Sequence, residues 1–191
     1  MSAGKDFEDA LMDGLEAWVG DDGYPMLRKQ QMAHRRGSFQ MGQELDILCD
    51  SPHDEYYIGL EAKSRNTESS AAGMYFSKLN PEQFLAQDEY RDASGRTVAV
   101  AVELRNCCER GDCGFLLPLD LFLKKIRNDA TKVSWDEVRE IGVHIGSNGD
   151  FEFSTAHFQS LQNNRETNRA TDEITNEEEL ANQLPSHEPR G

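Results

Sequence analysis

Two short apolar runs separated by a polar break constrain the fold of this chain more than any other stretch. The first run is Glu44–Cys49 and the second is Tyr56–Ser64. The break between them begins Asp-Ser-Pro-His-Asp at residues 50–54, a composition typical of a turn between neighbouring antiparallel strands. The stretch therefore predicts a β-hairpin.

Three charged side chains should fall on one face of this hairpin. Because side chains alternate between the two faces of a strand, Glu61 and Lys63 point the same way, about 7 Å apart along the second strand. Asp46 lies between the core-like residues Leu45 and Ile47. It should therefore face away from both of them, on a strand that can pair beside Glu61. The hairpin thus predicts that two carboxylates and one lysine meet on one sheet face.

This combination of side chains points to phosphodiester hydrolysis. Two carboxylates can share a hard divalent cation such as Mg²⁺, which takes oxygen ligands and keeps waters that a phosphate can displace. A neighbouring lysine can position an attacking water or help deprotonate it, and can stabilise charge that develops on phosphorus. The alternative is that Asp46, Glu61 and Lys63 form the solvated face of an amphipathic hairpin. An isolated D…E-x-K pattern favours that alternative, since acids and lysines are common.

The wider stretch over residues 6–127 resembles the PD-(D/E)xK nucleases, and among them most closely the archaeal Holliday-junction resolvases. Four features carry the resemblance in chain order: a helix with Glu8, a strand with Asp46, a strand with Glu61-Ala62-Lys63-Ser64, and a helix with Gln83. One departure is Leu45, which stands where the motif that names the family has proline.

The resemblance implies a restriction-endonuclease-like α/β fold, with a mixed central sheet flanked by helices. The implied ligands of Mg²⁺, for which Mn²⁺ could substitute, are Glu8, Asp46, Glu61 and the carbonyl of Ala62. Lys63 would handle the attacking water, and Gln83 would position that water or the scissile phosphate. The implied function is that of a metal-dependent endodeoxyribonuclease that cleaves branched DNA, four-way junctions in particular, as a homodimer.

Other interpretations stay open. A restriction-like or exonucleolytic DNase could use the same core, and Gln87 and Tyr90 resemble the glutamine–tyrosine pair of exonuclease-type relatives, although two residues separate them where that motif has three. A non-catalytic DNA-binding domain is the other alternative, but two carboxylates beside a phosphate would only repel it without a metal. Gln83 could instead complete a helix cap, and Glu8 could be a first-turn glutamate favoured by the helix dipole.

The chain is strongly acidic, which is unfavourable for a protein that grips a polyanion. Its 191 residues carry 35 acids against 20 Lys and Arg, a net charge of −15. Local cations on either side of the hairpin could still contact phosphates. The DNA-binding residues expected on this ground are Arg28, Lys29, Arg35, Arg36 and Arg65. Their alternative role is that of solvated side chains that balance neighbouring acids.

Helical and strand patterns alternate along the chain, which predicts the α/β class independently. Thr97–Val102 is a β-branched and small run typical of a central strand buried on both faces. Helices are expected over residues 6–19, from Pro81 after the cap residue Asn80, over 119–127, from a capping box at Ser134, and over 155–161. A short strand is expected at residues 24–27, a mobile loop at 65–73 and a hairpin over 142–153.

Composition divides the chain into a domain, residues 1–162, which the resemblance implies is a nuclease domain, and a disordered acidic tail, residues 163–191, which has almost no large apolar side chain. No hydrophobic run approaches a membrane span and the start lacks the apolar region of a signal peptide, so we expect a soluble cytoplasmic protein. Cys107, Cys108 and Cys113 cluster in one expected loop, away from Cys49. Reduced thiols are expected there, with a three-thiolate metal site completed by a distant histidine as the alternative.

Overall fold

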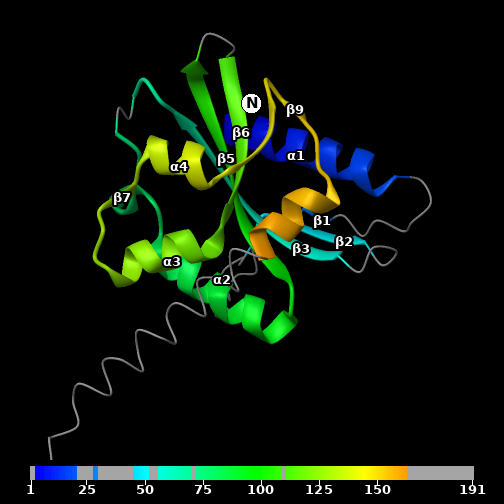
Figure 1. The fold of residues 1–191 in the computed structure, drawn as a ribbon, viewed down its shortest axis with the longest axis horizontal. Coiled ribbons are helices and arrows are strands. Elements are labelled where there is room, and N and C mark those ends of the chain that lie inside the picture. Colours follow the sequence, from blue (N-terminus) through cyan, green and yellow to red (C-terminus); the bar gives the residue numbers. More distant parts are fainter. Residues whose placement is uncertain are drawn as a thin grey trace, which may run out of the picture.

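The computed structural model describes residues 3–20, 28–29, 45–51, 56–69, 72–108 and 111–162. Within these ranges the chain is mixed α/β, with a curled seven-stranded sheet flanked by helices (Figure 1). The strands are, in spatial order, β1 (Arg28–Lys29), β2 (Ile47–Ser51), β3 (Tyr56–Asn66), β5 (Thr97–Cys108), β6 (Gly111–Pro118), β8 (Val143–Ser147) and β9 (Asp150–Phe151). β3 and β5 are parallel, and the other neighbouring pairs are antiparallel. The predicted α/β class is confirmed.

Helices cover both faces of this sheet. The helices are α1 (Ala3–Val19), α2 (Pro81–Ser94), α3 (Leu119–Arg127) and α4 (Trp135–Ile141), with a further helical segment over residues 155–162. α2, α3 and α4 lie on one side of the sheet, whereas α1 and residues 155–162 lie on the other (Figure 1). β4 (Met74–Tyr75) pairs with β7 (Lys132–Val133) in a small second sheet, and β4 leads into the 3-10 helix η1 (Phe76–Lys78). Among the described helices, none has both the length and the apolar character that a membrane span requires.

The sheet separates two hydrophobic clusters. Along β3, Ile58 and Leu60 belong to the cluster under α1, and the same alternation on β5 gives Ala99 and Ala101 to that cluster. Val98, Val100 and Val102 belong to the cluster under α2 and α3, where the Phe84 and Phe122 rings stack with centroids 4.9 Å apart. The prediction that Thr97–Val102 is buried on both faces is confirmed.

Most of the predicted elements are present. The helices expected at residues 6–19, 81 onward, 119–127 and 155–161 are confirmed, as is the hairpin near 142–153. The predicted capping box at Ser134 forms: its hydroxyl accepts from the Glu137 N–H, and the Glu137 carboxylate accepts from the Ser134 N–H. The strand expected at 24–27 and the tail at 163–191 lie outside the described residues.

Two predicted loops are wrong in part: residues 65 and 66 of the loop expected at 65–73 are strand, whereas residues 67–69 lie in a turn. Arg65 lies on β3, which continues to Asn66 because it pairs with β5 as far as Arg105. The three clustered cysteines, expected in a loop, also lie on strands, since β5 continues to Cys108 and β6 begins at Gly111. Strand pairing persists there across an irregular register between residues 104 and 108.

α1 packs closely against β9 at Gly14, where an added Cβ would lie 2.3 Å from the backbone oxygen of Phe151. Gly14→Ala should therefore lower the free energy of unfolding by about 1–3 kcal/mol, since the helix must move off the sheet. Gly4→Ala in the same helix meets nothing within 4 Å, and should be neutral or stabilising by up to about 1 kcal/mol. Urea denaturation of both variants tests this, and equal effects would contradict the close approach.

Candidate active site

Asp46 is attached to β3 at two points. It lies in a bend immediately before β2, and its backbone N–H donates to the Leu60 carbonyl at 3.0 Å. Its carboxylate Oδ2 accepts from the Ala62 N–H at 2.8 Å. These two hydrogen bonds hold the carboxylate beside residue 61 of the neighbouring strand.

The bend changes how Asp46 reaches this position. The prediction that Leu45 and Ile47 share a face is wrong, because Leu45 packs in the cluster under α2 and Ile47 packs in the cluster under α1. A Cβ on Gly59 would lie 2.3 Å from Leu45 Cδ1. The absence of a side chain at Gly59 therefore makes room for Leu45. The Asp46 side chain turns toward β3 through the bend, not through strand alternation.

Glu61 is held by two side chains. Its carboxylate is 1% exposed, and Oε1 forms an ion pair with the Lys63 ammonium group. Oε2 accepts from Gln87 Nε2 on α2 at 2.8 Å, and Gln87 is fully buried. Lys63 is 18% exposed, so this ion pair joins a buried carboxylate to an ammonium group that solvent can reach. The prediction that Glu61 and Lys63 point the same way is confirmed.

The two carboxylates share a region of unfavourable negative charge. The pKa of Glu61 is raised to about 7, chiefly by burial and in part by the charge of Asp46, while Lys63 opposes the rise. Burial also raises the pKa of Asp46, against the opposing effect of the Ala62 N–H. A nearby positive charge would favour the ionised form of both groups.

Two helices bring further predicted residues to this cluster. A hydrogen bond from the Gln83 side chain lowers the pKa of Glu61, so Gln83 on α2 reaches the carboxylate. The side chain of Asn80 makes no capping hydrogen bond at the start of α2. The negative charge of Glu8, half-buried on α1, raises the pKa of Asp46. Residues from helices on opposite faces of the sheet thus act on one pair of carboxylates.

The structure describes only some of the predicted DNA-binding residues. Arg28 and Lys29 form β1, whose backbone pairs with β2 opposite Leu48 and Ile47. Arg35 and Arg36 lie outside the described residues. Arg65 is half-buried on β3, two residues after Lys63.

Arg65 has a second arginine beside it. Burial lowers the pKa of Arg65, and the charge of Arg105 on β5 lowers it further. The buried Nε of Arg105 has no hydrogen-bond partner within the described part of the chain. Two like charges close together favour an anion between them.

Sequence reasoning did not assign Gln87 or Arg105 to the site. Gln87 follows Gln83 by one helical turn, so helical spacing already placed both on one face of α2. Arg105 carried no such signal, because its position beside Arg65 depends on the parallel pairing of β3 with β5.

No family model matches the chain, and no curated protein matches it. The chemistry of the cluster is therefore inferred from its own residues.

The donor set fits a hard divalent cation. Asp46, Glu61 and the Ala62 carbonyl offer only oxygen atoms, and burial, with a smaller effect of neighbouring acids, raises the pKa values of both carboxyl groups, so a cation would favour their ionised forms. Among the described residues, no three acidic, histidine or cysteine side chains gather into a metal-binding group. A cation held by two carboxylates would thus take other ligands from water and phosphate, as Mg²⁺ commonly does. Direct ligation by Glu8 stays a prediction.

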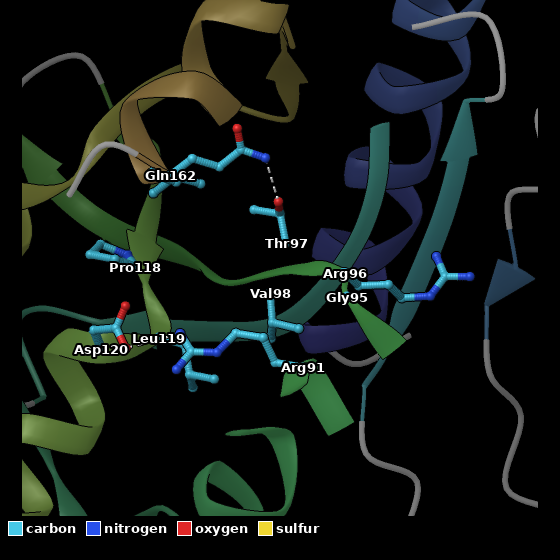
Figure 2. A pocket seen from close by; sticks show the side chains of 10 residues that line it. Arg91, Gly95, Arg96, Thr97, Val98, Pro118, Leu119, Asp120 and Gln162 are labelled. Carbon is cyan, nitrogen blue, oxygen red and sulfur yellow. Dashed lines mark hydrogen bonds and ion pairs between the residues drawn. The ribbon is translucent and has the colours of Figure 1, made fainter. Parts of the chain in front are cut away.

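A pocket of about 270 Å³ lies at the start of β5, and none of its lining residues belongs to this cluster (Figure 2). Its arginines are already paired, Arg91 with Asp88 and Asp120, and Arg96 with Asp50. Gln162 donates to Thr97 Oγ1 at 2.9 Å across the pocket (Figure 2). We assign this pocket no ligand.

Glu61 should make the stability of the metal-free protein depend on pH. Its pKa rises from 4.5 to about 7 on folding, so the folded state binds more protons than the unfolded chain in this window. The contribution of Glu61 to stability therefore falls as pH rises from about 4.5 to 7. Because Glu61→Gln removes the titrating group, the Tm of the variant should increase relative to wild type across that range.

Thermal denaturation in EDTA between pH 4.5 and 8 checks this prediction. Glu82→Gln, the same exchange at an exposed position on α2, is the matched control. A Tm difference between Glu61→Gln and wild type that does not change with pH would contradict it.

Proposed function

We propose that this chain is a Mg²⁺-dependent endodeoxyribonuclease of the PD-(D/E)xK type, with a restriction-endonuclease-like core, that cleaves branched DNA. The observation that supports this most is the meeting of Asp46, Glu61 and Lys63 beside Gln83, with Glu8 acting on Asp46 from α1. The helices and strands that carry these residues occur along the chain in the same order as in the motif of the Holliday-junction resolvases that the sequence resembles. A binding-only domain would gain nothing from a buried and a half-buried carboxyl group whose pKa values are both raised.

Asp46, Glu61 and the Ala62 carbonyl are the groups that would hold the cation. When bound, Mg²⁺ would supply positive charge beside the phosphate and favour ionisation of a water. The hydrogen bond from the Ala62 N–H fixes Asp46 Oδ2, so the other oxygen of this carboxylate can act as a ligand. The hydrogen bond from Gln87 fixes Glu61 Oε2, while Oε1 contacts Lys63. Gln87 is therefore a positioning residue for Glu61.

Lys63 is placed to act on the reacting phosphate. Its ammonium group contacts buried Glu61 and is itself more exposed, 18% against 1%. An ammonium group carries three N–H donors, so contact with Glu61 leaves donors for a water or a phosphate oxygen. In that position Lys63 would hold the attacking water and stabilise the charge that develops on phosphorus. Gln83, which also reaches Glu61, would help to orient that water.

One observation favours an exonucleolytic DNase as the second candidate. Gln87 is the glutamine of the Gln87–Tyr90 pair, and it is this residue that binds Glu61. Tyr90, by contrast, hydrogen-bonds to Arg96, where it helps to raise the pKa of that arginine. The two members of the pair therefore contact different groups, and we keep the endonuclease as the main proposal.

Cleavage of four end-labelled DNAs by the purified protein tests the proposal: a four-way junction, a fork, a linear duplex and a single strand. We expect Mg²⁺-dependent cuts in the four-way junction, paired on opposed strands because a homodimer would present two sites. Equal cleavage of the linear duplex would instead indicate a restriction-like enzyme, and stepwise release of nucleotides would indicate an exonuclease. Binding without cleavage in Mg²⁺ or Mn²⁺ would contradict the enzyme proposal altogether.

The cations beside the carboxylates should form a local phosphate-binding rim in this acidic protein. Arg65→Gln and Arg105→Gln should each weaken binding to every DNA shape alike and reduce the log–log salt slope by roughly one unit. The same is expected for Arg35 and Arg36. Fluorescence anisotropy at several salt concentrations measures both quantities.

Arg139→Gln is the matched control for this prediction, since Arg139 is exposed on α4 and pairs locally with Asp136. Unchanged affinity and unchanged salt slope in the Arg65 and Arg105 variants would place the DNA elsewhere on the surface.

A further inference from the structure

Two cysteines face each other near the end of the β5–β6 hairpin. Cys107 on β5 and Cys113 on β6 have their Sγ atoms 2.6 Å apart. The Cys107 thiol also lies 3.3 Å from the Gly111 carbonyl oxygen. Both residues are half-buried, so a small reagent can reach them.

The backbone on both sides of this pair is fixed. Asn106 adopts a left-handed conformation with φ 55°, and its N–H donates to the Asp112 carboxylate at 2.9 Å. Asp112 is in turn bound to Asn148: its N–H donates to Asn148 Oδ1 at 3.0 Å, and its carbonyl accepts from the Asn148 N–H at 2.9 Å. The residues next to Cys107 and Cys113 are therefore held in place before any bond joins the sulfurs.

Cys49 and a metal ion fit this position less well. Cys49 is fully buried on β2, and burial raises the pKa of its thiol to about 11, which keeps it in the unreactive protonated form. Among the described residues, no third cysteine, histidine or acid joins Cys107 and Cys113 in a metal-binding group. The pair is thus better suited to bond with itself than to hold a metal.

We propose that Cys107 and Cys113 are an oxidation site that closes into an intrachain disulfide in the presence of a peroxide. One thiolate attacks a peroxide oxygen, the O–O bond breaks, and a sulfenic acid and one water form. The second thiolate then attacks that sulfur, forms the S–S bond and releases a second water. In total, two thiols lose two electrons and two protons, and hydrogen peroxide is reduced to two waters.

The bond would tie β5 to β6 beside the segment that leaves β3. The Thr67 hydroxyl there is placed to donate to the carbonyls of Arg105, at 3.0 Å, and Asn106, at 2.8 Å. Oxidation would therefore restrain a hairpin end that this segment contacts. The proposal does not depend on nuclease activity.

The test treats the reduced full-length protein with hydrogen peroxide, then alkylates it under denaturing conditions and measures intact mass and a peptide map. In wild type, two of the four cysteines should resist alkylation, and the peptide map should join Cys107 to Cys113. Cys107→Ser and Cys113→Ser should abolish this protection. Cys108→Ser, a change at the adjacent position, should preserve it.

Alkylation of all four cysteines after oxidation would overturn the proposal, as would a bond to Cys49 or Cys108, or a disulfide-linked dimer. The decisive assignment comes from the wild-type protein, so it does not depend on the folding of any variant.

Discussion

Replacing Asp46 by asparagine or Glu61 by glutamine should abolish Mg²⁺-dependent DNA cleavage and leave folding and DNA affinity largely intact. Each exchange is nearly isosteric and removes the charge that would hold the cation. The amide oxygen introduced at position 46 can still accept from the Ala62 N–H, and the one introduced at position 61 can still accept from Gln87. Single-turnover cleavage of a labelled four-way junction, with circular dichroism and anisotropy on the same samples, measures all three properties.

Matched exchanges elsewhere control for the loss of an acid. Asp50 lies on β2, the strand that follows Asp46, and forms an ion pair with Arg96. Asp50→Asn therefore removes an acid that lies outside the proposed site. Glu82→Gln makes the Glu61 exchange at an exposed position of α2. Both controls should cleave at close to the wild-type rate. Cleavage by the Asp46 or Glu61 variant within a few-fold of wild type would contradict the proposed site.

Lys63→Gln should lower the turnover of bound DNA by about 100- to 1,000-fold, the effect expected when a group that stabilises developing charge is removed. DNA affinity should change little, because the proposed role of Lys63 is at the reacting phosphate. Lys78→Gln, at an exposed lysine of η1, is the control. Single-turnover rates at saturating protein separate the chemical step from binding.

The pH dependence of Lys63→Gln distinguishes two ways in which Lys63 could act. Lys63 lowers the pKa of Glu61, so its loss should shift the ionisation of Glu61 to a pH above about 7. If Lys63 acted only through Glu61, raising the pH would restore the wild-type rate. We expect the rate to stay low at high pH, because a donor to water or phosphate is missing. Full recovery at high pH would contradict a direct role.

Local sequence patterns are sufficient to predict the hairpin and the shared face of Glu61 and Lys63. Strand alternation depends only on neighbouring residues, so it predicts without any tertiary contact that Glu61 and Lys63 lie on one face. The Pro81 start of α2 and the capping box at Ser134 are local in the same sense. Helical spacing likewise predicted α1, which carries Glu8.

Contacts between distant segments account for the wrong or missed predictions. The bend at Asp46 depends on Leu45 filling the space at Gly59, on another strand. The extension of β3 through Arg65, and the place of Arg105 beside it, depend on the parallel pairing with β5. Cys107 and Cys113 face each other because β5 and β6 stay paired across an irregular register. The glycines and polar residues nearby predict a loop there instead.

The most direct test of the proposed metal centre measures Mn²⁺ binding by electron paramagnetic resonance in the absence of DNA. The samples are the wild-type protein, Asp46→Asn and Glu61→Gln. Mn²⁺ can stand in for Mg²⁺ at oxygen ligands and gives a signal that falls when the ion binds. We expect the wild type to bind Mn²⁺, Mg²⁺ to compete for the same site, and each variant to bind at least about tenfold more weakly, since a ligand charge is lost. Equal Mn²⁺ affinity in the wild type and both variants would show that Asp46 and Glu61 do not hold the metal.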